Sequence, residues 1–478
     1  MNRFFDFHLH PSFKPFLSNP NPGRRVDCWE YLESPIGIIR SQSCLDQMEK
    51  GRIGVAVSVI YAMERPMTSS FLIEHLAPRL TVLNGEMLDH PCYSNYLAYV
   101  HEEIEHLKKS QNLNGRTFNL LNSIEEAEED KMNLILALEG GHALEQFNTN
   151  VVDNLKSLKQ GPHRFLYLTF VHMTQYPLAT HAYGMKMIKG NDQFKPNGFG
   201  ITDIGKEVID MAYDESQGHR ILIDIKHMSL VSRHKFYQYR KEKGYDKIPI
   251  IGTHMGFTGI SKDPREIVKY FSKPARRRDN FIEVDYDRPS GIGKGLFNKT
   301  HFNPWSINLY DEDITEILNS GGLIGLSLDQ RIMGSQEVQG EFFSAKEFNY
   351  ILSGYKDEAK EEPVDEGEFS DEKEVGRELN ERKHLRHLCN NILHAVKVGG
   401  DRAWKQLCMG SDFDGLIDPL NNCTSAEEYP KLEKGLIEEL PQMMKEDKKH
   451  DYDDSNIEAK VRDIMYNNAL DFLKKNFK

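Results

Sequence analysis

The chain has 478 residues, and 60 Lys and Arg against 73 Asp and Glu leave a formal net charge of -13. This acidic balance argues against nonspecific binding to nucleic acid or to an anionic membrane surface. The six cysteines are scattered without a CxxC pair, so we expect free buried thiols. No apolar run reaches the length of a membrane span and no signal peptide fits before the first motif, so we expect a cytoplasmic protein.

Eight short, mostly apolar runs follow one another along the chain and read as strands. They begin at Arg3, Ile53, Asn133, Phe165, Ile221, Ile248, Gly322 and Lys405. Near-continuous apolar strands are typical of a parallel sheet that is covered on both faces. Segments with helical apolar spacing lie between them, for example residues 125–132, 202–215, 311–322 and 385–400. This alternation predicts an α/β fold, a (β/α)8 TIM barrel.

Four connections are too long for plain barrel loops. They lie near residues 11–50, 183–200, 262–308 and 331–380. All four follow strands, so we expect them on the C-terminal, catalytic face of a single barrel domain that spans residues 1–478. The last one contains a strongly acidic stretch near residues 356–375, which we interpret as a solvated loop.

Side chains that can bind a metal or transfer a proton stand at the C-terminal ends of these runs. They are His8 and His10 in FFDFHLH, Glu139 in ILALEGG, His227 in ILIDIKHMS, His254 in IPIIGTHMG and Asp412 in MGSDFDG. A (β/α)8 barrel has its active site at this end of its strands. Because His8 and His10 are two residues apart on a strand, they project to the same side and can chelate one ion. Imidazole and carboxylate ligands favour zinc over Mg²⁺ or Ca²⁺, and iron, cobalt or manganese would also fit.

Two acidic residues suit particular roles. Glu139 ends an otherwise apolar strand, where a carboxylate is costly unless it is paired or bound to metal, and one carboxylate can bridge two cations. Asp412 is the better candidate for carrying a proton to the leaving group. For Asp414 and His142, structural hydrogen bonding in a loop competes with a direct role.

Four stretches in order carry a family resemblance. They are EGGH from Glu139, LTFVHMTQYPLA from Leu168, IDIKHMS from Ile223 and GSDFDG from Gly410. They resemble the membrane (renal) dipeptidase family, peptidase M19, of the amidohydrolase superfamily. The resemblance implies two divalent metal ions, with Zn²⁺ favoured.

The resemblance also assigns residues. It implies that His8, His10 and Glu139 hold the first ion and that Glu139, His227 and His254 hold the second. The catalytic Asp of the family falls on Asp412. His172 matches a family His that contacts the substrate and polarises its scissile carbonyl or stabilises the tetrahedral intermediate.

The chain departs from the family at two places. The first-strand motif of the dipeptidases is usually HxD, whereas His10 makes it HxH here, which removes one anionic ligand. The Arg that grips the substrate carboxylate is also missing, since SINLYDED puts Ser306 or Ile307 at its place. We take Arg265, in the preceding insertion, as the first candidate to replace it, against the alternative of an ordinary surface charge.

The implied activity is that of a dipeptidase, including cleavage of dipeptides with a C-terminal D-residue. A hydroxide that bridges two metal ions attacks the amide carbonyl, and Asp412 delivers a proton to the leaving amine. One alternative is hydrolysis of another small amide, ester or lactone, and a further one is a catalytically silent barrel scaffold. Apart from this small-molecule or dipeptide substrate, a homodimer is the possible partner, with no membrane and no nucleic acid.

Overall fold

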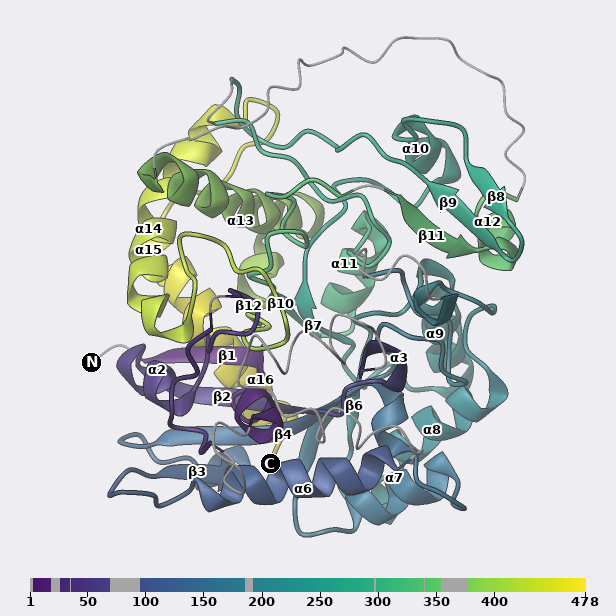
Figure 1. Cartoon of the computed structure of the whole chain (residues 1–478). Helices are drawn as coiled ribbons and strands as arrows, with labels where there is room; N and C mark the ends of the chain where they lie inside the picture. Colours follow the sequence, from purple (N-terminus) through teal and green to yellow (C-terminus); the bar gives the residue numbers. More distant parts are fainter. Residues whose placement is uncertain are drawn as a thin grey trace.

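A computed structural model describes residues 3–18, 26–34, 36–68, 95–184, 192–295, 298–338, 340–353 and 377–478. Eight parallel strands form its main sheet in the order β1-β2-β4-β5-β6-β7-β10-β12. They are β1 (Phe4–Leu9), β2 (Ile53–Tyr61), β4 (Met132–Glu139), β5 (Phe165–Thr169), β6 (Leu222–Asp224), β7 (Ile251–Met255), β10 (Leu323–Leu326) and β12 (Leu407–Met409). Each of the eight apolar runs contains one of these strands, so the predicted (β/α)8 barrel is confirmed (Figure 1).

The two ends of the sheet meet, which nearly closes the barrel. Leu9 and Phe413 form an isolated parallel bridge between the ends of β1 and β12. The amide of His10 donates to the carbonyl of Phe413 at 2.9 Å, and the amide of Asp412 donates to the carbonyl of His8 at 2.9 Å. The closing contacts therefore run through the segments that carry three of the predicted site residues. A ninth strand, β3 (Phe118–Leu121), pairs with the first half of β4 outside this ring.

Helices surround the sheet (Figure 1). They are α1 (Phe13–Leu17), α2 (Leu45–Lys50), α3 (Arg65–Thr68), α6 (Tyr96–Lys109), α7 (Val151–Lys159), α8 (Asp203–Tyr213), α9 (Leu230–Lys243), α10 (Pro264–Lys269), α11 (Asp311–Asn319), α12 (Ala345–Ile351), α13 (Arg377–Gly399), α14 (Tyr429–Glu446), α15 (Ile457–Arg462) and α16 (Asn468–Asn476). The helices predicted within 202–215, 311–322 and 385–400 are confirmed as α8, α11 and part of α13.

The helix predicted at 125–132 was wrong. Only a short 3-10 turn, Ile124–Glu126, precedes β4, which begins at Met132. The segment carries acidic residues at positions 125, 126, 128, 129 and 130, so a helix would stack like charges one turn apart. It also has no apolar stripe to bury against the barrel.

Two of the predicted insertions combine into one subsidiary unit. Strands β8 (Arg276–Arg278), β9 (Phe281–Val284) and β11 (Glu341–Ser344) form an antiparallel sheet in the order β11-β9-β8. Its apolar side chains, with those of neighbouring loops, form a second hydrophobic cluster apart from the barrel core. Figure 1 shows this sheet with α10 and α12 to one side of the barrel. The acidic stretch near 356–375 lies outside the described residues.

The described cysteines agree with the prediction of buried free thiols, and the helices bear on the prediction about membrane spans. Five of the six cysteines are buried free thiols, as expected: Cys28, Cys44, Cys389, Cys408 and Cys423. Cys92 lies outside the described residues. Within the part of the chain that the structure describes, no helix has the length and apolarity that crossing a bilayer requires.

Candidate metal centre

The barrel brings the predicted ligands together around one carboxylate. Glu139, at the end of β4, is buried with 3% exposure. The imidazole Nε2 atoms around it lie 3.5 Å (His8), 3.3 Å (His10), 3.6 Å (His227) and 3.6 Å (His254) from its nearer oxygen. These residues come from the C-terminal ends of four strands that are distant in sequence, β1, β4, β6 and β7. The structure therefore brings all five predicted ligand candidates together.

The spacing of these atoms fits metal coordination. Two ligands that each lie about 2.0–2.1 Å from one tetrahedral ion are about 3.4 Å from each other. The Nε2 atoms of His8 and His10 are 3.2 Å apart, and those of His227 and His254 are 3.3 Å apart. Glu139 contacts both histidine pairs: Oε1 is the nearer oxygen for His8, His227 and His254, and Oε2 is the nearer oxygen for His10. The donor set of four imidazoles and a carboxylate fits divalent zinc or a similar ion.

Hydrogen bonds set the tautomer of His8. The hydroxyl of Tyr167 donates to the carbonyl of Phe7 at 2.9 Å, so its oxygen is left to accept from the His8 Nδ1–H, also at 2.9 Å. With its proton on Nδ1, the ring presents the lone pair of Nε2 to the cluster. A partner of this kind orients a metal-binding histidine and raises its basicity.

Hydrogen bonds set the tautomer of His254 in the same way. The Thr253 hydroxyl donates to Oδ2 of Asp224 at 2.7 Å and lies 2.9 Å from His254 Nδ1, from which it accepts. Asp224 also accepts from Thr169, at 2.7 Å. In contrast, the buried Nδ1 atoms of His10 and His227 have no hydrogen-bond partner among the described residues. Both rings point Nε2 at Glu139, so the atoms used for coordination are available on all four histidines.

Electrostatics separates the two carboxylates of the centre. Burial would raise the pKa of Glu139, but electrostatic interactions with the His172 and His8 imidazoles and hydrogen bonds from His10 and His227 hold this pKa well below its usual range. Burial raises the pKa of Asp412, against the opposing effect of its hydrogen bond with His10. Two acids with pKa values displaced in opposite directions are typical of a division between a charged ligand and a proton carrier.

His10 carries a proton when no metal is bound. Burial lowers its pKa, but hydrogen bonds and charge from Asp412 and Glu139 outweigh burial and raise the pKa of His10 to about 10. Its Nε2 lies 3.5 Å from Oδ1 of Asp412 and 3.3 Å from Glu139. Because a ligand histidine must be neutral, a metal ion has to displace this proton.

Two of the site residues adopt a backbone conformation that is rare outside glycine. His227 has φ 64° and Asp412 has φ 65°, both in the left-handed region. Each residue directly follows the turn out of a barrel strand, and the surrounding packing must hold it there. Such strain is concentrated at functional sites. Here the His227 imidazole faces Glu139, and the Asp412 carboxylate faces His8 and His10.

His172 reaches the centre with a partner that sequence reasoning missed. Its Nε2 lies 3.8 Å from Glu139, while its Nδ1 lies 2.6 Å from Oε1 of the buried Glu64. The Tyr61 hydroxyl donates to the other oxygen of Glu64. Glu64 follows the end of β2, so the strand-end rule that found the other residues also points to it.

Asp414 and His142, for which the sequence left a structural and a direct role open, form structural contacts. Asp414 forms a buried ion pair with Lys14 at 2.7 Å and accepts from the amides of Gln42 and Ser43. His142 Nε2 lies 2.7 Å from the backbone carbonyl of Ala62. Neither belongs to the groups of potential metal ligands found among the described residues.

The role predicted for Arg265 needs correction. The structure does not bring it to the cluster: its side chain is 75% exposed on α10 and forms an ion pair with Asp263, two residues away, at 2.7 Å. The prediction used the distance along the chain after His254, but the intervening loop leads away from the barrel mouth toward the insertion sheet. Of the two residues that the resemblance puts at the place of the family Arg, Ile307 is a buried apolar residue, and the buried Ser306 donates its amide hydrogen to Glu341 at 2.8 Å.

A buried cation was also missed. Lys226, next to His227, is 1% exposed, and its Nζ has no hydrogen-bond partner in the described part of the chain. Burial lowers its pKa to about 8, although Asp412 and Asp329 act in the opposite direction. The signal was a single lysine inside the apolar run ILIDIKHMS. It adds positive charge to a centre that already has His10 in place of an acid.

Three solved structures with a similar fold are a dipeptidase, a metallopeptidase and a probable dipeptidase. A dipeptidase AC of family M19 is 14% identical, with a TM-score of 0.53, and the match covers 100% of this chain and 99% of that one. A metallopeptidase from Rhodobacter sphaeroides, in complex with a phosphinate mimic of L-Ala-D-Ala, is 14% identical with a TM-score of 0.52 and 99% coverage of both chains. The probable dipeptidase PvdM from Pseudomonas aeruginosa is 11% identical with a TM-score of 0.52, covering 99% of this chain and 95% of that one. At these identities the likeness shows the shared fold.

The sequence comparisons give one family match, which covers part of the chain. No curated protein sequence matches the chain significantly. The family model of the membrane dipeptidases, peptidase family M19, matches residues 39–269, a range that includes Glu139, His172, His227 and His254. His8, His10 and Asp412 lie outside this range and join the centre through the closure of the barrel. The family model covers just under half of the chain; over this part the chain is similar to the membrane dipeptidases, in agreement with the resemblance seen in the sequence, and the match supports a metal-dependent hydrolase.

Proposed function

We propose that the chain is a dipeptidase that works with two divalent metal ions, of which Zn²⁺ is the favoured kind. The observation that carries this proposal is the contact of Glu139 with two histidine pairs, whose four Nε2 atoms lie 3.3–3.6 Å from its oxygens. His8 and His10 would hold one ion, His227 and His254 the other, and Glu139 both. When bound, the ions would activate a water molecule and polarise the scissile carbonyl.

Asp412 is the proton carrier in this proposal. Its Oδ1 lies 3.5 Å from His10 Nε2 and 3.8 Å from His8 Nε2, at the edge of the ligand set. Its raised pKa lets it accept a proton from the attacking water. It then delivers this proton to the amide nitrogen as the C–N bond breaks, so that one amino acid leaves with a free amine and the other with a new carboxylate.

His172 binds the oxygen of the scissile carbonyl. Burial would lower its pKa, but the charges of Glu64 and Glu139 raise it, so the ring is protonated and both of its nitrogens can donate. Glu64 accepts from Nδ1, which leaves the Nε2–H for the oxygen that gains negative charge during attack. A positioned charged donor of this kind stabilises the transition state more than the substrate.

The dipeptide substrate rests on the family match and on one related fold. The metallopeptidase from Rhodobacter sphaeroides was solved with a mimic of L-Ala-D-Ala. We therefore propose L,L dipeptides and L,D dipeptides as substrates. The second candidate is another small amide, ester or lactone, which is favoured by the exposed position of Arg265 and by the apolar Ile307 at the place of the family Arg.

The decisive experiment combines a substrate panel with one substitution. Zinc-replete protein is incubated with L,L and L,D dipeptides, and release of free amino acids is measured together with the metal content. We expect turnover, which Asp412→Asn lowers by at least about 100-fold while the metal content stays the same. Asp203→Asn, at a 94% exposed aspartate, removes the same charge and serves as the control.

The outcomes separate the candidates. Metal-replete protein that cleaves no dipeptide but hydrolyses a small amide, ester or lactone in an Asp412-dependent way supports the second candidate. Protein that hydrolyses nothing on either panel supports the silent barrel scaffold. A metal content of one ion for each chain contradicts the two-ion centre whatever the substrate.

A further inference from the structure

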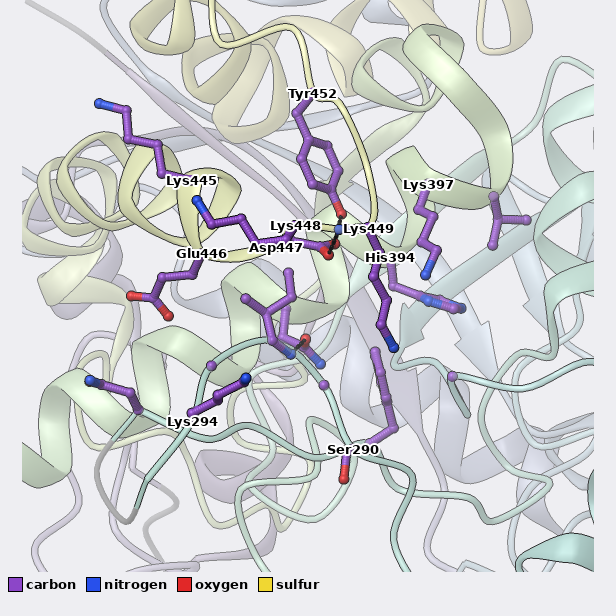
Figure 2. A pocket seen from close by; sticks show the side chains of 18 of the residues that line it. Ser290, Lys294, His394, Lys397, Lys445, Glu446, Asp447, Lys448, Lys449 and Tyr452 are labelled. Atoms are coloured by element: carbon purple, nitrogen blue, oxygen red, sulfur yellow. Dashed lines mark hydrogen bonds between the residues drawn. The ribbon is translucent and has the colours of Figure 1, made fainter.

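A second site-like feature lies outside the metal centre. A pocket of about 840 Å³ is formed by the loop residues 290–294 and Asn298, the C-terminal part of α13, and the end of α14 with the segment that follows it. Figure 2 shows the side chains that line it, with Lys294 on the loop, Lys397 on α13 and Lys448 and Lys449 after α14. None of the residues of the metal centre lines this pocket.

The pocket is rich in unpaired positive charge. Its five lysines are Lys294, Lys397, Lys445, Lys448 and Lys449. Exposed lysines elsewhere on the chain often pair with acids, as Lys269 does with Glu266 at 2.6 Å. By contrast, among the described residues no ion pair involves any of the five. A cluster of unpaired lysines is unexpected on a chain of net charge -13, because nearby acids would normally be available to neutralise it.

The wall also contains three acids, and within the described part of the chain none of them forms an ion pair with the five lysines. Asp311 pairs with His394 at 2.8 Å, Glu446 with Arg386 and Asp447 with the hydroxyl of Tyr452 at 2.8 Å. The bond between Asp447 and Tyr452 is visible in Figure 2. Asp447 keeps its negative charge beside the neutral Tyr452 hydroxyl, so five lysines and three acids leave an excess of positive charge at the pocket.

An unsatisfied donor inside the pocket gives a second, independent indication. Asn390 lines the pocket and is only 1% exposed, and its Nδ2 has no hydrogen-bond partner among the described residues. Its Oδ1 accepts from the amide of Ile292 at 2.9 Å, which identifies the other atom as the NH2 group. A buried donor without an acceptor is destabilising, so a ligand that supplies the acceptor would be favoured here. The missing group is thus an acceptor, in agreement with the charge of the lysines.

We propose that this pocket binds a small soluble molecule with two or more phosphate groups. Lysine ammonium groups and amide N–H donors are common ligands of phosphate oxygens, and phosphate offers only acceptors and negative charge. The volume is within the range of about 300–1,000 Å³ that is typical of small-ligand pockets. Several lysines on three separate segments suit a ligand with more than one phosphate, since a single phosphate cannot reach all of them.

Calorimetric titration of the metal-loaded protein with tripolyphosphate, pyrophosphate and orthophosphate at constant ionic strength tests this proposal. We expect one binding site for each chain and an affinity that increases in the order orthophosphate, pyrophosphate, tripolyphosphate. The variant Lys294→Gln/Lys397→Gln/Lys449→Gln should raise the tripolyphosphate Kd by at least about tenfold. Asn390→Asp, which keeps the acceptor for Ile292 and removes the NH2 donor, should also weaken binding.

The matched control is Lys241→Gln/Lys269→Gln/Lys434→Gln, which changes the net charge equally at lysines 64–77% exposed outside the pocket. Its Kd should stay within about twofold of the wild type. Equal weakening in both triple variants would indicate a general charge effect and overturn the proposal, as would the absence of tripolyphosphate binding.

Two further measurements exclude other sources of a signal. The metal content is measured after each titration, because chelation of the centre would affect all variants alike, whereas pocket binding would not. Vesicles with phosphorylated inositol headgroups form the other arm. Binding to these vesicles without binding of soluble tripolyphosphate would contradict a soluble ligand.

Discussion

The imidazole Nδ1 of His172 lies 2.6 Å from Oε1 of Glu64, and both side chains are buried beside the metal centre. Burial would raise the pKa of Glu64, but the positive charges of His172 and His142 lower it. The same contact contributes to the raised pKa of His172. Glu64 thus keeps His172 charged and turns its Nε2 toward the substrate side of Glu139.

Glu64→Gln should lower kcat about 10–100-fold with little change in metal content, because the His172 imidazole loses its anionic partner but stays in the same position. The pKa of His172 should fall, so the activity that needs the protonated ring should be lost at a lower pH than in the wild type. A pH profile of kcat/KM measures this shift. Glu105→Gln, on the exposed face of α6, is the control. An unchanged profile would contradict the role of Glu64.

Metal binding should release a proton from His10. Its pKa of about 10 in the metal-free protein means that the ring is charged at neutral pH, and the ion must displace this proton. Zinc affinity should therefore increase with pH up to about pH 10. The release of the His10 proton contributes an increase of up to about tenfold for each pH unit. Calorimetry in buffers of different ionisation enthalpy counts the protons. His10→Gln should release about one proton fewer; an equal number would refute this assignment.

Closure of the barrel should depend on Asp6. Its carboxylate accepts from the amides of His8 and Ser411 at 3.0 Å, from the Ser411 hydroxyl at 2.5 Å and from the Tyr429 hydroxyl at 2.6 Å. Asp6→Ala leaves these buried donors without an acceptor and should destabilise the fold by about 2–4 kcal/mol. Tyr429→Phe, which removes one donor, should cost about 1 kcal/mol. Denaturant unfolding measures both, and a smaller loss for Asp6→Ala would contradict the closing role.

The stability of the fold should depend on pH through Glu341. Burial raises the pKa of Glu341 to about 8, although hydrogen bonds from Ser306 lower it. The folded state thus keeps the proton that the unfolded chain loses above its ordinary pKa near 4.5. Stability should fall as the pH rises from about 5 to about 8, because the unfolded state binds fewer protons over this range.

Glu341→Gln tests the source of that dependence. The amide keeps an acceptor for Ser306 but does not titrate, so the fall in Tm between about pH 5 and about pH 8 should be smaller by several degrees. Glu283→Gln, in the neighbouring strand β9, is a control that retains the wild-type dependence. A variant of Glu341 with the full pH dependence would assign the effect to another group.

Arg265→Ala should leave both kcat and KM within about twofold of the wild type. The guanidinium is 75% exposed and bonded to Asp263, and an exposed pair of this kind contributes little. Steady-state kinetics with the best dipeptide of the panel measures the effect. A large increase in KM would restore Arg265 as the grip of the substrate carboxylate.

Much of the metal centre could be predicted from the sequence. Each ligand stands at the end of an apolar run, as Glu139 does after LILAL and His254 after IPIIGT. The C-terminal ends of parallel barrel strands share one face, so residues at those ends meet whatever their separation along the chain. The same regularity could have predicted Glu64, which follows β2.

What the sequence by itself determined was therefore the barrel and the set of candidate ligands at its strand ends, because strand periodicity and strand ends are local properties of the chain. Only the tertiary structure decided which side chains pair around them. Asp6 meets Ser411 across 405 residues, and Glu64 meets His172 across 108. Such pairs depend on the stagger of neighbouring strands and on the paths of the loops, which no local pattern encodes. For this reason Arg265, close to His254 along the chain, lies away from the centre, whereas five lysines from three segments line one pocket.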